Sequence, residues 1–287
     1  MGIFNKKEGD GERINFLYKN KTFPLRYQVQ QSTSLIINDE SINEVNVEIL
    51  WRIDSWEKNE EGFLISIVSE KYETKSSNQM ADLIILLSKF NDPIDHLLIQ
   101  LNAKGEPVRV VNQQEVFEKW LFLRNGEFAD FATEEVTNNL LIGGDIDFRD
   151  VLPLILKSNY YILFLTPVYG LKSNYNPTYN KLNLESIIFS GNNIELILGE
   201  RISNVSDTDI SIEHIGTGYI QNYKAIEKKY NEEFKQLIDV PLSYDYDFYA
   251  NYLYNTDGRL FKCKAEIQER ANPKVISKQS YTITIIQ

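Results

Sequence analysis

Alternation of apolar and polar residues predicts that β-strands make up much of this chain. In the segment 44–53, Val45, Val47, Ile49 and Trp51 fall on one face, and largely polar residues fall on the other. This period of two is typical of a strand with one buried face. Similar patterns or short apolar runs predict strands at 62–72, 94–101, 108–111, 160–165, 184–189, 194–202, 210–220, 244–254, 259–268 and 282–286. The segment 14–30 predicts a hairpin, whose second strand Pro24 places at a sheet edge.

Other segments repeat their apolar residues every three or four positions, which is the period of an amphipathic helix. The segment 78–90 shows this period, and the Asn-Asp-Pro sequence that follows is expected to end the helix. The segment 113–158 predicts three helices in succession, and 222–238 predicts a strongly charged helix. Residues 168–183, which are rich in Tyr, Asn and Pro, predict a loop.

Glycines and acids between 143 and 150 predict where two helices of this middle region meet. The pair Gly143 and Gly144 is expected to end the second helix. Asp147 precedes the apolar run of the third helix as an N-cap would, with Asp145 and Asp150 nearby, because acids favour a helix N-terminus. The same glycines do not form a phosphate cradle, since the Lys-Ser/Thr of a P-loop is missing.

The order of the predicted elements repeats at an offset of about 150 residues. Strand, strand, strand, helix, strand, hairpin turn and strand follow one another twice. The strand 45–53 matches 194–202 at an offset of 149 (194 − 45), and the turn Asn102–Gly105 matches Asn255–Gly258 at 153 (255 − 102). Agreement of element order, spacing and turn chemistry favours a structural duplication. Coincidence is the alternative, because Asn-x-x-Gly turns are common and residue identity is low.

These patterns together predict an α+β protein, rich in antiparallel sheet, with two related halves joined by a helical connector. Residues 14–111 are expected to form the first half and residues 183–287 the second, each as strand-strand-strand-helix-strand-strand. Residues 112–182 would form the connector, with a buried strand and a loop, and residues 1–13 a mobile N-terminus. The length of 287 residues also allows one large domain.

The charge and the cysteine content narrow the function and the compartment. The chain carries 41 acidic and 30 basic residues, a net charge of −11, and no long run of Lys or Arg. Because nucleic acids and anionic membranes attract basic surfaces, we expect no nucleic-acid partner. No segment has the roughly 20 apolar residues of a spanning helix, so we expect no membrane insertion. The chain has one cysteine and no apolar signal segment, which is typical of a cytoplasmic protein. Its composition, rich in Lys, Asn, Ile and Tyr, suggests a bacterial source.

Signatures of catalysis are missing, so an enzyme is not favoured. His96 and His214 each follow acidic residues, but no HExxH motif and no paired histidines occur. A metal site at either histidine is one interpretation, and incidental histidines among solvated surface acids is the one we favour. Cys263 alternates with apolar residues and is expected to be a buried, unreactive thiol. We expect no metal and no cofactor.

The segment 244–254 carries the candidate binding residues. Alternation places five aromatic side chains on one face, those of Tyr244, Tyr246, Phe248, Tyr252 and Tyr254. A tyrosine has an apolar body and a polar tip, so such a face suits the contact surface for a partner or an elongated ligand. Packing of this face beneath the helix 222–238 is the alternative.

These observations favour a non-catalytic intracellular binding protein, whose acidic character suits a basic protein partner. One alternative is a carrier that holds a small hydrophobic ligand or a lipid between a curved sheet and its helix. A second alternative is a hydrolase that uses two carboxylates, because 41 acids offer many pairs. No motif in the sequence identifies a family.

Overall fold

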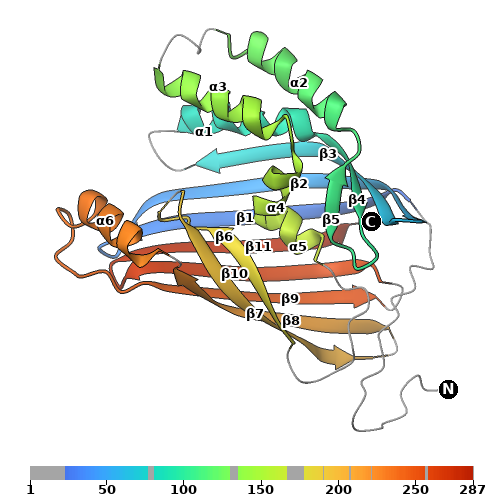
Figure 1. The fold of residues 1–287 in the computed structure, drawn as a ribbon. Coiled ribbons are helices and arrows are strands. Elements are labelled where there is room, and N and C mark those ends of the chain that lie inside the picture. The colour runs from blue at the N-terminus through green and yellow to red at the C-terminus, as the bar shows by residue number, and fades with distance from the viewer. Residues whose placement is uncertain are drawn as a thin grey trace.

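A single antiparallel sheet of 11 strands dominates the fold (Figure 1). The computed structural model describes residues 23–76, 81–129, 135–166, 178–189, 191–206, 208–220, 222–255 and 258–286. The strands are β1 (Leu25–Ile37), β2 (Glu40–Asn59), β3 (Gly62–Ser76), β4 (His96–Leu101), β5 (Pro107–Val110), β6 (Thr178–Glu185), β7 (Asn193–Val205), β8 (Asp209–Ile220), β9 (Asp245–Asn255), β10 (Leu260–Asn272) and β11 (Val275–Ile286). The helices are α1 (Ala81–Ser88), the 3-10 helix η1 (Lys89–Ile94), α2 (Gln113–Asn125), α3 (Glu135–Asp147), α4 (Leu152–Lys157), α5 (Asn159–Phe164) and α6 (Tyr223–Glu233). The predicted α+β class, rich in antiparallel sheet, is confirmed.

The chain builds the sheet from its centre to one edge and then from the other edge back to the centre. The strand order is β5-β4-β3-β2-β1-β11-β10-β9-β8-β7-β6. β1 therefore pairs with both β2 and β11, and the prediction that it lies at an edge is wrong. The physical reason is that Pro24 lies just before the strand, where its missing N–H costs no ladder hydrogen bond. Residues 1–22, with the first strand of the predicted hairpin, lie outside the described residues.

Helices α4 and α5 lie on one face of the sheet, and we call this the inner face and the opposite one the outer face (Figure 1). Alternation along the strands supplies the inner face with buried apolar side chains, which form one cluster from Ile99 on β4 to Leu196 on β7. Helix α5 contacts β10 and β11 in the middle of this cluster. A second, smaller cluster includes Ile226 and Tyr230 of α6.

The prediction of a strand at 160–165 is wrong, because these residues form helix α5. The helix begins at Asn159, after Ser158 has left the helical region with φ −82° and ψ 114°. Tyr161, Leu163 and Phe164 are buried. A short run that is apolar on all sides fits a buried strand and a buried helix equally well, because it has no period that tells them apart.

The end of the predicted connector also differs from the structure. Strand β6 occupies part of the predicted loop 168–183, and it ends at Glu185, within the predicted strand 184–189. The chain then bends, because the backbone amides of Ile187 and Ile188 donate hydrogen bonds to a side chain of β10 instead of a neighbouring strand. Residues 167–177 lie outside the described residues.

The predicted end of a helix at the glycine pair is wrong, since α3 continues to Asp147. Packing explains the glycine at 144, because a Cβ on Gly144 would lie 2.4 Å from the ring of Trp120. Asp147 is therefore the last residue of α3 and not an N-cap. Asp145 accepts a hydrogen bond from Trp120 Nε1 at 2.8 Å, which holds the ring in place. Of the three acids, Asp150 contacts the next helix, accepting from its first backbone amide at 3.3 Å.

We expect Gly144→Ala to destabilise the protein by about 1–3 kcal/mol, the usual cost of inserting a methyl group into a packed site. This cost should exceed the gain of about 1 kcal/mol that alanine brings to a helix. Gly143→Ala is the matched control, because a Cβ at Gly143 meets no atom within 4 Å. Urea unfolding followed by circular dichroism measures both variants. A Gly144→Ala protein as stable as Gly143→Ala would contradict the packing argument.

The two halves share the geometry of one hairpin turn, while their common origin stays a prediction. The amides of Asn102 and Asn255 each donate to the carbonyl four residues later, both at 2.9 Å. Gly105 and Gly258 occupy the left-handed region, with φ of 93° and 86°. Both halves also add their strands in sequence across the sheet. Any simple meander has this order, so the order does not separate duplication from coincidence, and the predicted domain boundaries stay predictions too.

Candidate functional site

The aromatic face predicted on 244–254 exists, and it points inward. Tyr246, Phe248, Tyr252 and Tyr254 are at most 7% exposed, and Tyr244 is half-buried. Strand β9 lies between β8 and β10, so its inner side chains meet the core. The alternation is confirmed, and the role of these five side chains in binding stays a prediction.

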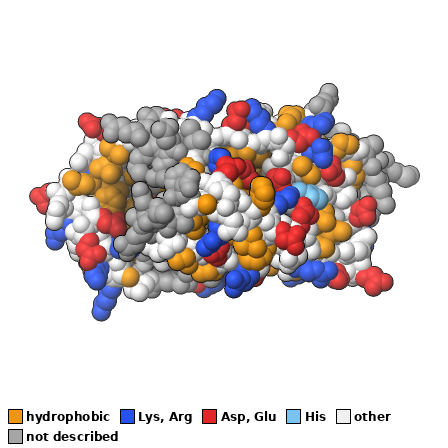
Figure 2. Space-filling view, turned by 90° about the horizontal axis from the view of Figure 1, so that it is seen from above, with side chains coloured by type: hydrophobic (Ala, Val, Ile, Leu, Met, Phe, Trp, Pro, Cys, Tyr) orange, Lys and Arg blue, Asp and Glu red, His pale blue; other side chains and the backbone are white. Residues whose placement is uncertain are grey.

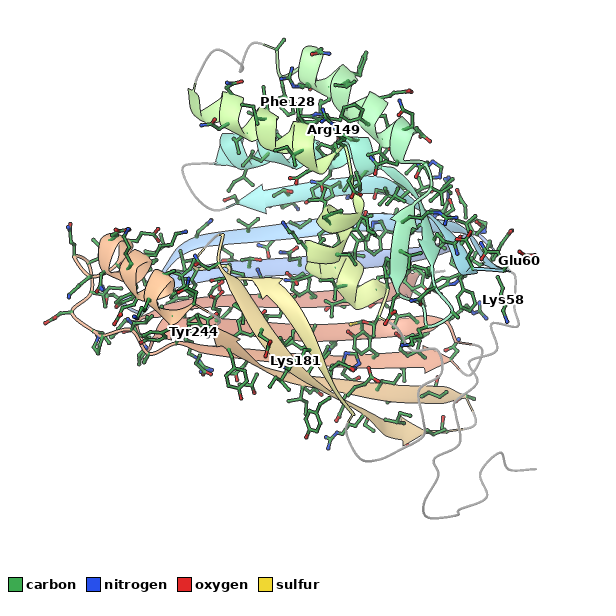
Figure 3. All side chains as sticks on the ribbon, viewed as in Figure 1. Lys58, Glu60, Phe128, Arg149, Lys181 and Tyr244 are labelled. Carbon is green, nitrogen blue, oxygen red and sulfur yellow. The ribbon has the colours of Figure 1, made fainter. Side chains whose placement is uncertain are left out.

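The hydroxyl of Tyr244 donates to a buried carboxylate near α6 (Figure 3). Glu269 of β10 has no solvent exposure. It accepts hydrogen bonds from Tyr244 Oη at 2.8 Å, Ile187 N at 2.7 Å and Ile188 N at 3.2 Å, and Ser186 Oγ donates to it as well. Burial, and then the charge of Glu269, raises the pKa of Tyr244, so this hydroxyl keeps its proton. The carboxylate therefore fastens the bend after β6 to the sheet.

The interpretation of His214 as an incidental histidine among solvated surface acids stays a prediction, but its own side chain is buried. His214 is 3% exposed, and its Nε2 lies 3.1 Å from Oε2 of Glu200, its buried register partner on β7. The ring of Tyr252 lies 4.8 Å away, and the Tyr252 hydroxyl accepts a hydrogen bond from Thr166 at 3.0 Å. Strand parity explains this burial, because His214 follows Ile212 by two residues and both point inward.

His96 is half-buried at the start of β4. Its Nε2 lies 3.2 Å from Ser66 Oγ, and its Nδ1 lies 3.8 Å from a carboxylate oxygen of Glu115. Within the described ranges, no group of three or more His, Cys, Asp or Glu side chains is placed to hold a metal ion. Of the two acids that are buried among the described residues, Glu269 accepts hydrogen bonds from non-acidic groups and Glu200 lies beside His214. A hydrolase that pairs carboxylates stays a hypothesis.

Cys263 is fully buried, as predicted, and we expect it to be unreactive in the native protein. Burial raises the pKa of the thiol, so little thiolate forms near neutral pH, and the thiolate is the nucleophile. We expect 5,5′-dithiobis(2-nitrobenzoic acid) at pH 8 to leave native Cys263 unlabelled and to label it fully in urea. Complete labelling of the native chain within minutes would contradict this expectation.

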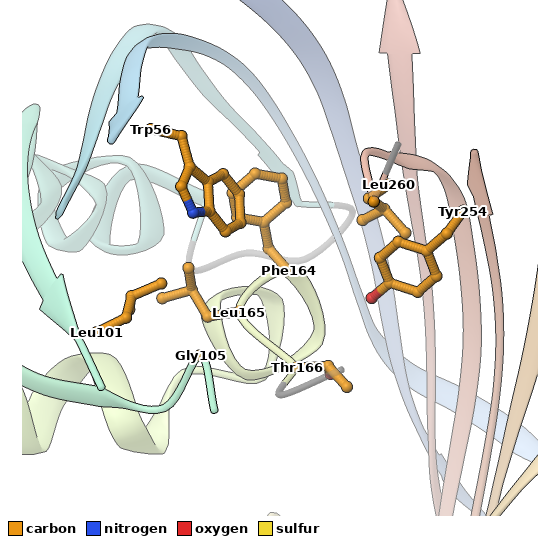
Figure 4. Close-up of a pocket in the computed structure, with 9 residues that line it drawn as sticks. Trp56, Leu101, Gly105, Phe164, Leu165, Thr166, Tyr254 and Leu260 are labelled. Atoms are coloured by element: carbon orange, nitrogen blue, oxygen red, sulfur yellow. The ribbon is translucent and has the colours of Figure 1, made fainter. Parts of the chain in front are cut away.

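A small apolar crevice lies where α5 ends, between the two matching hairpin turns (Figure 4). It is lined by Trp56, Leu101, Gly105, Phe164, Leu165, Thr166, Tyr254, Gly258 and Leu260. Its volume is about 10 Å³, close to the space that one water molecule needs. In this structure the crevice is too small for a larger ligand.

An exposed row of large side chains lies on the outer face of the sheet. Tyr179 of β6, Gly199 of β7, Ile215 of β8 and Tyr249 of β9 are successive register partners. Tyr179, Ile215 and Tyr249 are 71%, 48% and 41% exposed. The missing side chain of Gly199 leaves space for the Tyr179 ring, which would lie 3.3 Å from a Cβ there. We call these four residues the outer row.

Two adjoining grooves continue from the outer row across the sheet. Their volumes are about 490 and 320 Å³, and they share Ser32 and Ser280. They follow the register partners Tyr249, Glu266, Ser280, Ser32, Asn46 and Lys75 from β9 to β3. We call the outer row and these two grooves together the outer trough. Because neighbouring strands lie about 4.8 Å apart, the eight spacings from β6 to β3 give it a length of about 38 Å.

The charged side chains beside the outer row pair with one another. Lys181, on β6 (Figure 3), lies 2.8 Å from Glu195, and Arg201 lies 2.5 Å from Glu213. Four acids, Glu48, Glu73, Asp247 and Glu266, and two bases, Lys75 and Lys278, line the two grooves. Two of these acids pair with bases outside the lining, because Glu73 lies 3.0 Å from Lys71 and Asp247 lies 2.6 Å from Arg270. Acids and bases are also interspersed on the side that is seen from above in Figure 2. The outer trough is therefore a surface of mixed charge with an apolar end.

Sequence reasoning missed the outer row because it judged each strand alone. Along β9, Tyr249 lies on the same face as the polar residues of the strand. Only the pairing of the four strands β6 to β9 brings it into line with Ile215 and Tyr179. One signal was present in the sequence. Gly199 interrupts a strand, and a glycine there often marks the close approach of another group.

Comparison with known proteins adds two distant likenesses. No family model and no curated protein matches the chain. A structure of lipovitellin, described by its lipid–protein interactions, is 8% identical and has a TM-score of 0.49; the match covers 92% of this chain and 25% of that one. This chain therefore spans about a quarter of the length of that relative. An outer membrane channel from Pseudomonas putida F1 is 8% identical over 94% of this chain and 98% of that one, with a TM-score of 0.18.

Where the chain is described, its helices are too short or too polar to cross a membrane. Both TM-scores lie below 0.5, and neither likeness shows a shared fold.

Proposed function

We propose that this chain is a non-catalytic cytoplasmic binding protein that holds an elongated segment of a basic protein partner in the outer trough. The observation that carries the proposal is the outer row. Tyr179, Ile215 and Tyr249 are exposed side by side at one end of a groove. The opposite face of the same strands is buried and contributes to the core. Aligned exposed aromatics mark interaction surfaces, and tyrosine is a frequent hot-spot residue in them.

The net charge of the chain supports a basic partner. Four acids and two bases line the grooves, and the whole chain carries a net charge of −11. Glu266 lies next to Tyr249 in the register, so a cation of the partner would sit beside the aromatic anchor. Complementary charge speeds association and is screened by salt, so binding should weaken as the salt concentration rises.

The experiment compares Tyr249→Ser with Tyr219→Ser. Tyr249 and Tyr219 are 41% and 55% exposed on the same face, but Tyr219 does not line either groove. The immobilised parent protein captures its partner from the native host, and the affinity of that partner is then measured for each variant. We expect Tyr249→Ser to weaken binding at least tenfold, which corresponds to about 1.4 kcal/mol. We expect Tyr219→Ser to bind like the parent.

Two results would contradict the proposal. One is a parent chain that captures no partner at its native concentration. The other is a partner whose affinity is the same for the parent and for Tyr249→Ser. Both tyrosines are too exposed to support the core, so thermal unfolding should place the two variants close to the parent and exclude misfolding as the cause.

Carriage of a small hydrophobic ligand on the inner face is a second candidate. One buried polar atom beside α5, Trp51 Nε1, has no hydrogen-bond partner, and buried polar atoms usually have one. A ligand could supply this partner, and the crevice in Figure 4 marks an apolar opening beside α5. Native mass spectrometry of freshly purified protein tests this candidate. A mass above that of the 33.4 kDa chain would support it, and the bare chain mass would count against it.

A further inference from the structure

The two edges of the sheet differ in how well they are protected against pairing with another chain. Strand β5 covers four residues, begins with Pro107, and carries Arg109 in an ion pair with Glu61 at 2.5 Å. Its pairing with β4 also shifts register within a few residues. Short strands, proline, charge and irregularity are the features by which proteins prevent an edge from acquiring a partner strand. The β5 edge has all four.

Strand β6, at the other edge, lacks most of this protection. It covers eight residues without a proline, and it pairs with β7 over eight positions without a register shift. Lys181 pairs with Glu195 as Arg109 of β5 pairs with Glu61, so charge does not distinguish the two edges, whereas length, proline and regularity do. In the described part of the chain, β7 is the one strand that pairs with β6. Among the described residues, the backbone donors and acceptors on the other side of β6 therefore face no partner strand.

The β6 edge is continuous with the outer trough. Tyr179 is both a residue of β6 and the end of the outer row, and its ring lies over Gly199 of β7 and so away from the edge. A strand added beside β6 would lie about 4.8 Å further out. One of its side chains would fall in register with Tyr179 and extend the outer row by one position.

The charge of the chain decides between two occupants of this edge. A second copy would bring another net charge of −11 to the contact, and like charges of that size oppose association. A basic segment would meet a chain of opposite net charge. We propose that the edge of β6 is a docking site at which a basic protein partner adds an extended segment as a twelfth strand. This inference rests on the proposed function, because it describes how that partner continues beyond the trough.

Hydrogen exchange tests strand addition directly. The probe is a ten-residue peptide of alternating Lys and Val, acetylated and amidated at its ends. At saturating peptide we expect the alternate backbone amides of residues 178–185 that point away from β7 to exchange at least tenfold more slowly. Amides of residues 108–110, on the protected edge, serve as the internal control and should not change. The same peptide N-methylated at every residue keeps its charge and side chains but lacks backbone donors, and it should give no protection.

Three outcomes would overturn the inference. Residues 178–185 could exchange at an unchanged rate up to the solubility limit of the peptide. The N-methylated peptide could protect them equally, which would leave charge attraction as the cause. Protection could also rise with protein concentration in the absence of peptide, together with a dimer in sedimentation, which would make a second copy the occupant.

The variant Tyr249→Ser separates this inference from the proposed function. It removes the aromatic anchor of the trough and leaves the backbone of β6 unchanged. Peptide protection of residues 178–185 should therefore persist in this variant, while capture of the native partner falls. If the parent captures a partner through Tyr249 but peptide protection is absent, the trough is supported and strand addition is overturned.

Discussion

Replacing Glu269 by alanine should lower the free energy of unfolding by about 3–5 kcal/mol. This carboxylate is fully buried and accepts hydrogen bonds from Tyr244, Ser186 and the amides of Ile187 and Ile188. Hydrogen bonds to a charged group contribute about 1.5–3 kcal/mol each, and the cost of burying the charge offsets part of their sum. Alanine would leave all four donors without this acceptor and would free the bend after β6. Urea unfolding followed by circular dichroism measures the change.

Glu266→Ala is the matched control for this experiment. Glu266 lies on the same strand with the same charge, but on the exposed outer face, where substitutions usually change stability by less than about 0.5 kcal/mol. Glu269→Gln should fall between the two, because an amide keeps one acceptor and turns the other into a donor that faces donors. If Glu269→Ala and Glu266→Ala were equally stable, Glu269 would not fasten residues 186–189 to the sheet.

Trp51→Ala should cost a similar amount, about 3–5 kcal/mol, because it removes the largest kind of side chain from a closed core. Trp51 has no solvent exposure and lies at the centre of the contact between the sheet and α5. Its ring stacks on Tyr161 at 5.1 Å, meets Phe164 edge-on at 5.2 Å and lies 5.8 Å from Tyr160. The loss should therefore loosen α5 as well as β2, and near-ultraviolet circular dichroism should report both.

Trp51→Phe distinguishes loss of packing from loss of the indole N–H. Phenylalanine keeps an aromatic ring against α5 and removes Nε1, a buried donor without a partner. Removing such a donor relieves a cost of about 1–3 kcal/mol, which should offset part of the smaller ring volume. We expect Trp51→Phe to lie within about 1.5 kcal/mol of the parent. A Phe variant as unstable as the Ala variant would mean that the indole N–H is satisfied by a bound group, which would favour the carrier function.

Local patterns were sufficient wherever one segment alone determines the structure. Alternation over 44–53 lies inside β2, and the turn Asn102–Gly105 joins β4 and β5 as predicted. The four-residue spacing over 222–238 begins α6 at Tyr223, although the helix ends early, at Glu233. In each case the period or the glycine of the turn carries the information within a few residues.

Predictions failed where a distant residue decides the structure. The run 160–165 is apolar on every side, so its own sequence fits a strand or a helix. It forms a helix whose side chains pack in the core on the inner face of the sheet. The expected strand after Leu184 ends because Glu269, more than 80 residues later, draws the backbone amides away. Sequence reasoning missed the outer row for the same reason, because its members lie on separate strands. Neither a period nor a motif records such contacts, since each depends on the order of strands in the sheet.

The central pairing of β1 with β11 has a consequence for how the chain is synthesised. Arg26 and Ile286 are register partners across 260 positions (286 − 26), so the middle of the sheet closes last. While the ribosome makes the intervening segments, β1 has one neighbour and exposes an open edge. Such long-range pairing folds slowly, and open edges of this kind promote aggregation. A nascent chain of this protein should therefore depend on chaperones until β11 emerges and joins the two meanders into one sheet.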